Sequence, residues 1–150
     1  MSKIRIGDIF EINTPKGKGY LHYVYKDKLM GDLIRVLPGL YSERPDNLSE
    51  LAKSKERYMI FFPLSAAYKK KSIEYAGRLD LIDFVKPGYM RDTHIVRGDF
   101  LGWHIIDTNT IHRQLVKNLT IEQGKLSPWG IWNDTLLIER LVTGWTLEEW

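Results

Sequence analysis

Four histidines are the side chains of this 150-residue chain best suited to bind a metal ion or to transfer a proton. They are His22, His94, His104 and His112. None has the H-x-x-x-H or H-E-x-x-H spacing that brings two imidazoles to one face of a helix, and there is no cysteine to complete a zinc site. His104 and His112 flank a predicted hairpin turn at residues 107–110. Symmetric closure of that turn pairs Ile106 with Ile111 and puts the two imidazoles on opposite faces. The sequence therefore predicts no metal and no cofactor.

Nucleophilic catalysis requires a hydroxyl or thiol that a neighbouring base activates. The chain lacks the G-x-S-x-G turn that presents a catalytic serine. Its glycine-bearing segment Lys16-Gly17-Lys18-Gly19 lies in a predicted hairpin turn, whereas a phosphate-binding loop opens a helix. Carboxylate pairs such as Asp80 with Asp83 and Glu148 with Glu149 resemble solvated surface acids. The sequence predicts no catalytic residue, which disfavours an enzyme.

The composition is that of one globular domain spanning residues 1–150. Hydrophobic residues make up 43% and charged residues 27%, so one core can form and no stretch has the composition of a linker. The N-terminus lacks the apolar stretch of a secretory signal, and no segment approaches the ~18 apolar residues of a membrane span. A cytoplasmic protein that does not enter a membrane is expected. The net charge of +3 is low for a dedicated nucleic-acid binder, and the lysines at 69–71 fit a solvated loop or helix end.

The N-terminal residues 5–26 predict a β-hairpin on which the other elements are assembled. Apolar residues alternate before a turn at residues 14–17, and a second run follows from Tyr20 to Tyr25. Tyr20 and Val24 point one way in that run, whereas Leu21, Tyr23 and Tyr25 point the other. Both faces therefore need covering, which predicts a central strand.

Further elements follow along the chain. Residues 33–37 predict a third strand, and the apolar run 58–62 predicts a strand buried within the sheet. Asn47 with Glu50 forms a capping box for a short helix that ends near Ser54. Residues 65–75 fit either helix or strand, and residues 79–90 read mostly as loop. Residues 94–96 predict a short strand that ends in a turn at Arg97-Gly98-Asp99.

The last quarter of the chain predicts a helix over residues 134–143. Asn133 is a good N-cap, an apolar stripe follows, and Gly144 stands where a left-handed residue ends a helix. Trp129, Trp132 and Trp145 are expected to pack this helix against the sheet, whereas Trp150 fits either packing or binding. Together these elements predict an α+β fold: a curved antiparallel sheet or partial β-barrel with the C-terminal helix packed on it.

Several short segments resemble the Immunity protein 26 family of bacterial polymorphic toxin systems. The resemblance rests on Ile6-Gly7-Asp8-Ile9-Phe10-Glu11-Ile12, Gly19-Tyr20, residues 45–51, Trp103-His104-Ile105-Ile106-Asp107 and Trp129-Gly130-Ile131-Trp132-Asn133-Asp134. It implies a small cytoplasmic antidote that binds and blocks the C-terminal domain of a cognate toxin. Some relatives carry a phosphotriesterase label, so a small hydrolase is one alternative, and a weakly basic nucleic-acid-binding module is another.

A specific protein interface needs aromatic and arginine anchors but no chemistry of its own. Six residues in segments expected to be exposed loops are the candidates for contact with the toxin. They are Tyr41, Arg44, Tyr68, Tyr89, Arg91 and Trp103. The basic balance of the chain favours an acidic partner surface over the basic cleft of a nuclease.

Overall fold

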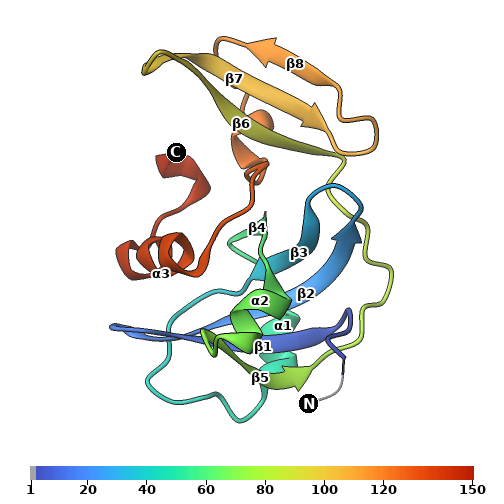
Figure 1. Ribbon diagram of the computed structural model, residues 1–150, viewed down its shortest axis with the longest axis vertical. Coiled ribbons are helices and arrows are strands. Elements are labelled where there is room, and N and C mark those ends of the chain that lie inside the picture. The colour runs from blue at the N-terminus through green and yellow to red at the C-terminus, as the bar shows by residue number, and fades with distance from the viewer. Residues whose placement is uncertain (1–2) are drawn as a thin grey trace.

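The computed structural model describes residues 3–150, which form two antiparallel sheets, three α-helices and two short 3-10 helices (Figure 1). The five-stranded sheet, in the order β4-β3-β2-β1-β5, consists of β1 (Asp8–Thr14), β2 (Gly17–Asp27), β3 (Gly31–Val36), β4 (Tyr58–Phe61) and β5 (Ile73–Arg78). The three-stranded sheet consists of β6 (Tyr89–Val96), β7 (Asp99–Asp107) and β8 (Arg113–Val116). The helices are α1 (Leu48–Ala52), α2 (Leu64–Lys69), α3 (Asp134–Thr143), η1 (Gln123–Lys125) and η2 (Leu147–Glu149).

The predicted N-terminal hairpin is confirmed, and its second strand is central. β1 and β2 pair antiparallel with Phe10 opposite Leu21, and the Thr14 hydroxyl donates to the Gly17 carbonyl at 2.7 Å across the turn. β2 lies between β1 and β3. A bulge between Tyr23 and Tyr25 interrupts its register with β3, so the predicted alternation fails beyond Tyr23.

Both faces of the five-stranded sheet are covered, as the sequence predicted. On one face, α3 and α2 pack on Phe10, Ile12 and Leu21. On the other face, α1 packs beside Ile9 and Tyr20. This arrangement buries alternate side chains of β1 and β2 in two different clusters.

The helix α3 has the predicted bounds because its end signals are local. The Asn133 side chain accepts a hydrogen bond from the Leu136 amide at 2.8 Å, and Gly144 ends the helix in the left-handed region with φ 69°. Trp132 and Trp145 bury their rings beside it, 5.6 Å apart between centroids. The prediction that tryptophans pack this helix against the sheet is confirmed for Trp132 and Trp145. Trp129 is also buried, but in a different cluster, with Phe61 and Met90.

The strand β4 forms where the apolar run predicted it, but not inside the sheet. It pairs with β3 alone and is the edge strand. Residues 127–132 cover its free edge: the Phe61 amide donates to the Gly130 carbonyl at 3.2 Å, and the Trp132 amide donates to the Phe61 carbonyl at 2.9 Å. The sequence predicted that a strand would pair on each side of residues 58–62. On one side, the irregular segment 127–132 provides the hydrogen bonds in place of a strand.

Residues 65–75, which fitted two structures, form both: α2 and then β5, with a turn between them at Lys71, whose φ is 63°. The short helix α1 is capped by Asn47 as predicted.

In the three-stranded sheet, β6 begins five residues earlier than predicted, and Arg97 and Gly98 form the expected turn with φ values of 52° and 84°.

The predicted register of the β7–β8 hairpin is wrong by two residues, because Ile106 pairs with Arg113 and not with Ile111. Asp107 explains the difference. Its side chain accepts from the Asn109 amide at 2.8 Å, and its carbonyl accepts from the Ile111 amide at 2.8 Å. Ile111 has φ 66°, so the loop extends through residue 112 before the strands pair.

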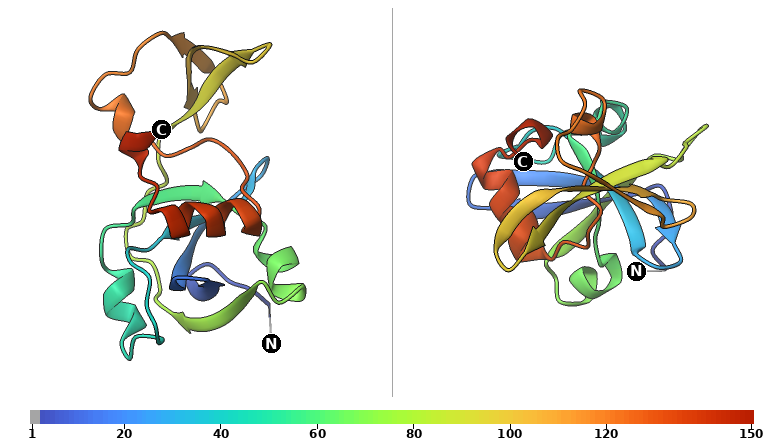
Figure 2. Two further views of the ribbon diagram at one scale, coloured as in Figure 1. Left: turned by 90° about the vertical axis from the view of Figure 1, so that its left-hand side faces the viewer. Right: turned by 90° about the horizontal axis from the view of Figure 1, so that it is seen from above.

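The fold is α+β, with curved open sheets that do not close into a barrel (Figures 1 and 2). The two sheets meet through one apolar cluster, in which Met90 and Ile106 of the three-stranded sheet pack with Val24, Phe61 and Trp129. Within residues 3–150, no helix is both long and apolar enough to cross a lipid bilayer.

Candidate functional site

The structure separates the six predicted toxin-contact residues into three places. Tyr41 and Arg44 lie beside the β1–β2 hairpin, and Tyr68 lies on α2 with its ring 6.1 Å from Phe10. Tyr89, Arg91 and Trp103 belong to the three-stranded sheet. The fold therefore does not gather the six into one surface.

Arg44 is partly exposed but is held in an ion pair. Its Nε lies 3.0 Å from Oε1 of the buried Glu11, which also accepts from the Tyr20 hydroxyl at 2.8 Å and from Lys18 Nζ at 3.2 Å. Burial acts to raise the pKa of Glu11, but the hydrogen bonds from Arg44, Tyr20 and Lys18 outweigh it and leave the pKa below its usual value. Arg44 thus compensates a buried carboxylate.

Arg91 and Trp103 are not in exposed loops, which corrects the sequence prediction. Arg91 lies in β6 and is 1% exposed, and Trp103 lies in β7 and is 8% exposed. The Arg91 guanidinium carbon lies 4.7 Å from the ring centroid of Trp103 and 4.5 Å from that of Trp150. Strand alternation places both side chains on the face of the sheet that the C-terminal segment covers.

The three-stranded sheet instead exposes a group of side chains that the sequence did not single out. At the β6–β7 turn, four apolar residues are between 42% and 55% exposed. They are Ile95, Val96, Phe100 and Leu101, named here the apolar tip. Figure 1 shows the β6–β7 turn projecting at the end of the molecule away from the five-stranded sheet. One feature of the sequence could have predicted this surface. Apolar residues stand on both sides of the β6–β7 turn, and such residues next to a turn are left in water unless a partner covers them.

The apolar tip is supported from within by aromatic rings. Ile95 and Phe100 face each other across the hairpin. The Phe100 ring contacts Trp103 edge to face at a centroid distance of 5.4 Å, and Trp103 contacts Trp150 at 5.1 Å. Phe100 is therefore half exposed yet anchored to a buried aromatic group, which is the arrangement of a preorganised contact residue.

The charges near the apolar tip are mainly positive. Arg97 lies within the turn and Asp99 follows it, both exposed. Lys117, just beyond strand β8, is also exposed and lies beside Gly102. Two cations and one carboxylate thus accompany the apolar residues at this end of the sheet, whereas Arg113 pairs with Ile106 at the other end.

Two histidines that the sequence analysis did not pair, His94 and His104, lie next to each other on the three-stranded sheet. His104 Nε2 and His94 Nδ1 lie 2.9 Å apart, and Asp92 pairs with His104 across the strands. Burial lowers the pKa of His104, the nearby His94 and Arg113 lower it further and Asp92 opposes them, so the His104 ring favours its neutral form. The sequence compared His104 with His112 because they flank a turn, and it missed the cross-strand neighbour. In the part of the chain that the structure describes, no three histidine, aspartate or glutamate side chains are grouped so as to hold a metal ion.

Comparison of the chain with models of known protein families, with curated proteins and with solved structures finds no match.

A buried histidine elsewhere predicts how stability depends on pH. His22 Nδ1 lies 2.9 Å from Arg35 Nη1, and its Nε2 lies 2.9 Å from the Leu79 carbonyl oxygen. Arginine can only donate, so Nδ1 accepts, and the neutral ring donates from Nε2 to Leu79. Burial lowers the pKa of His22 and Arg35 lowers it further, while the hydrogen bond to Leu79 opposes them. Below the unfolded pKa of ~6.5, the unfolded chain therefore binds more protons than the folded protein.

We expect the free energy of unfolding to be highest above pH ~6.5 and to fall as the pH drops toward 5, with His22 contributing up to about 1.4 kcal/mol per pH unit. The His22→Gln variant keeps an acceptor and a donor but cannot titrate, so its stability should change less over this range. Urea unfolding at several pH values measures both slopes, with His112→Gln, an exposed histidine, as the control. Equal slopes for the wild type and His22→Gln would contradict the assignment.

Proposed function

We propose that the protein is an immunity protein that neutralises a cognate toxin by binding the toxin's C-terminal domain through the apolar tip. The observation that carries this proposal is the exposure of Phe100, Leu101, Ile95 and Val96 on the paired strands β6 and β7. A soluble protein keeps a group of large apolar side chains in water at a cost, and such groups mark surfaces that are covered by a partner. The resemblance to the Immunity protein 26 family supports the same reading.

The chemistry of the tip suits a protein partner better than a nucleic acid. Nucleic-acid affinity depends chiefly on cations that neutralise phosphates, whereas the tip presents aliphatic groups and one aromatic ring. Arg97 and Lys117 nearby favour a partner whose contact surface is acidic at its rim and apolar at its centre. A toxin whose contact surface is a basic nuclease cleft fits this pattern poorly.

Phe100 is expected to be the strongest single contact, because it combines exposure with support from Trp103. The Phe100→Ala variant should bind the toxin domain more weakly by about 2 kcal/mol or more, while its own free energy of unfolding changes by less than about 1 kcal/mol. Ile82→Ala is the matched control, since Ile82 is 86% exposed and lies in the loop between β5 and β6.

The candidate toxin for the test is the variable C-terminal domain of any large secreted or contact-delivered protein that the gene immediately upstream encodes. Co-expression measures rescue of growth, and calorimetry with the purified domain measures affinity at low and high salt. Binding through the apolar tip should persist at high salt, whereas binding to a polyanion should collapse. Rescue without a detectable complex would refute the binding mechanism and favour the hydrolase alternative. Rescue with full affinity for Phe100→Ala would refute the tip as the contact surface.

A further inference from the structure

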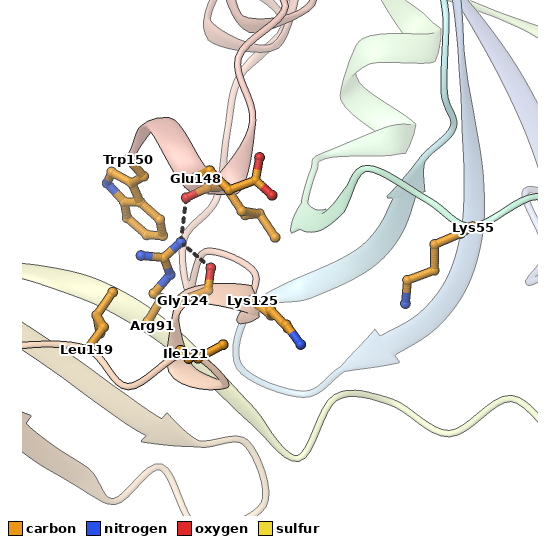
Figure 3. A pocket seen from close by; sticks show the side chains of 9 residues that line it. Lys55, Arg91, Leu119, Ile121, Gly124, Lys125, Glu148 and Trp150 are labelled. Atoms are coloured by element: carbon orange, nitrogen blue, oxygen red, sulfur yellow. Dashed lines mark hydrogen bonds between the residues drawn. The ribbon is translucent and has the colours of Figure 1, made fainter.

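A pocket of about 600 Å³ lies beside Arg91, apart from the apolar tip (Figure 3). Segments that are distant in sequence form its walls: Arg91 from β6, Ile121 and Lys125 from the connection after β8, Glu148 and Trp150 from the C-terminal segment, and Lys55 from the loop before β4. None of the four tip residues lines it. Its volume falls in the range of small-molecule sites, ~300–1,000 Å³.

The charge at the back of this pocket has no acidic partner. Arg91 Nε donates to the Leu126 carbonyl at 3.0 Å, and Nη2 donates to the carbonyls of Gly124 at 3.1 Å and Leu147 at 2.8 Å. Within residues 3–150, no carboxylate forms an ion pair with Arg91, and its Nη1 group has no hydrogen-bond acceptor. Two donor hydrogens of a buried cation thus remain for a ligand.

Burial lowers the pKa of Arg91 to about 10, with no opposing contribution from a neighbouring acid, so the group is still a cation at neutral pH. A buried cation without a counter-ion is costly, and an anion placed against it recovers part of that cost. Among the described residues, two polar side-chain atoms are sealed from solvent and lack a hydrogen-bond partner: His104 Nδ1 and Arg140 Nε. Nη1 of Arg91 is not one of them, so this unpaired atom touches solvent. A ligand can therefore reach it.

The rest of the lining defines what kind of anion fits. Lys125 and Lys55 also line the pocket, each in an ion pair with a neighbouring glutamate: Lys125 with Glu122 at 3.2 Å and Lys55 with Glu56 at 3.0 Å. In Figure 3 the Lys125 side chain points away from Arg91, which leaves Arg91 as the cation closest to Trp150. Trp150 and Ile121 contribute an aromatic and an aliphatic wall. An anionic head group with an apolar body matches both parts.

We propose that this pocket binds a small organic anion, with a carboxylate or phosphate head at Nη1 of Arg91 and an apolar body against Trp150 and Ile121. The planar guanidinium, packed against two indole rings that contact each other, presents its free hydrogens to an oxyanion at little entropic cost. The site is separate from the toxin-binding surface and does not depend on it.

The test is a titration of the labelled wild-type protein with hexanoate, hexyl phosphate and hexanol, followed by nuclear magnetic resonance. The indole N–H of Trp150 and the Nε–H of Arg91 report on the pocket. At least one anion should give saturable shifts of both signals and should bind about tenfold or more tightly than hexanol, because charged hydrogen bonds are lost with the neutral compound. The comparison of hexanoate with hexyl phosphate identifies the preferred head group.

Removing Arg91 threatens the fold, so a variant at the pocket mouth provides the mutational test. Lys125→Glu reverses an exposed charge and should weaken anion binding about threefold to tenfold, while Lys16→Glu, in the distant β1–β2 turn, should leave it unchanged. Equal binding of hexanol and the anions, no saturable shift with either anion, or an unaltered affinity in Lys125→Glu would each overturn the proposal.

Discussion

The Arg91→Met variant is expected to lower the free energy of unfolding by about 3 kcal/mol or more. The arginine donates to three main-chain carbonyls, two of them in residues 124–126 and the third at residue 147. Methionine keeps an unbranched apolar chain beside the indole rings of Trp103 and Trp150 but provides no donor. Each carbonyl left without a partner costs about 1–3 kcal/mol when water cannot reach it.

This loss should be concentrated in the C-terminal part of the chain, because Arg91 connects β6 to the segments on either side of α3. Urea unfolding measures the total change, and hydrogen exchange of residues 119–126 and 147–150 measures where it occurs. Arg113→Met on β8 replaces an exposed arginine of the same sheet and should change stability by less than about 0.5 kcal/mol. A similarly small change for Arg91→Met would show that the three hydrogen bonds contribute little.

The second large effect is expected from Trp132→Ala, which should destabilise the protein by about 3–5 kcal/mol. The Trp132 ring is buried and lies 5.5 Å from Tyr58 and 5.6 Å from Trp145. It thus joins β4 of the five-stranded sheet to the segment that follows α3. Truncation to alanine removes the transfer free energy of an indole and leaves a cavity between rigid aromatic neighbours that cannot collapse.

Thermal and urea unfolding measure this change, and Ile131→Ala is the matched control. Ile131 precedes Trp132 directly but is 58% exposed, so its truncation should cost less than about 1 kcal/mol. Arg140 also lies over the Trp132 ring, at 5.9 Å, so the loss should affect the packing of α3. A change below 1 kcal/mol in Trp132→Ala would mean that the aromatic cluster repacks around the missing ring.

Two separate surfaces follow from the same buried group of side chains. Trp103 supports Phe100 of the apolar tip on one side, while Trp150 and Arg91 form the back of the anion pocket on the other. Because the rings of Trp103 and Trp150 are in edge-to-face contact, an anion that shifts the Trp150 signal can also be examined for its effect on binding of the proposed toxin partner. Binding at the two surfaces is measured by different ligands, so the failure of one proposal leaves the other standing.

The sequence by itself determined the elements whose signals lie within a few residues. Asn133 and Gly144 mark the two ends of α3 because capping is a hydrogen-bonding and backbone requirement of neighbouring residues. The N-terminal hairpin, the capping by Asn47 and the coverage of both faces of β2 follow for the same reason: alternation and turn residues act locally.

Only the tertiary structure decided which residues meet across the chain. Arg91 looked like a loop cation, but it is buried because β6 begins before it and residues 124–126 and 147 supply its acceptors. The β7–β8 register depends on the hydrogen bonds of Asp107, whose effect on loop length residue types alone did not reveal. His94 meets His104 through pairing of β6 with β7, and Phe100 is exposed because no other segment among residues 3–150 covers its side chain. These features depend on contacts between residues far apart in sequence, and composition and periodicity describe only neighbours.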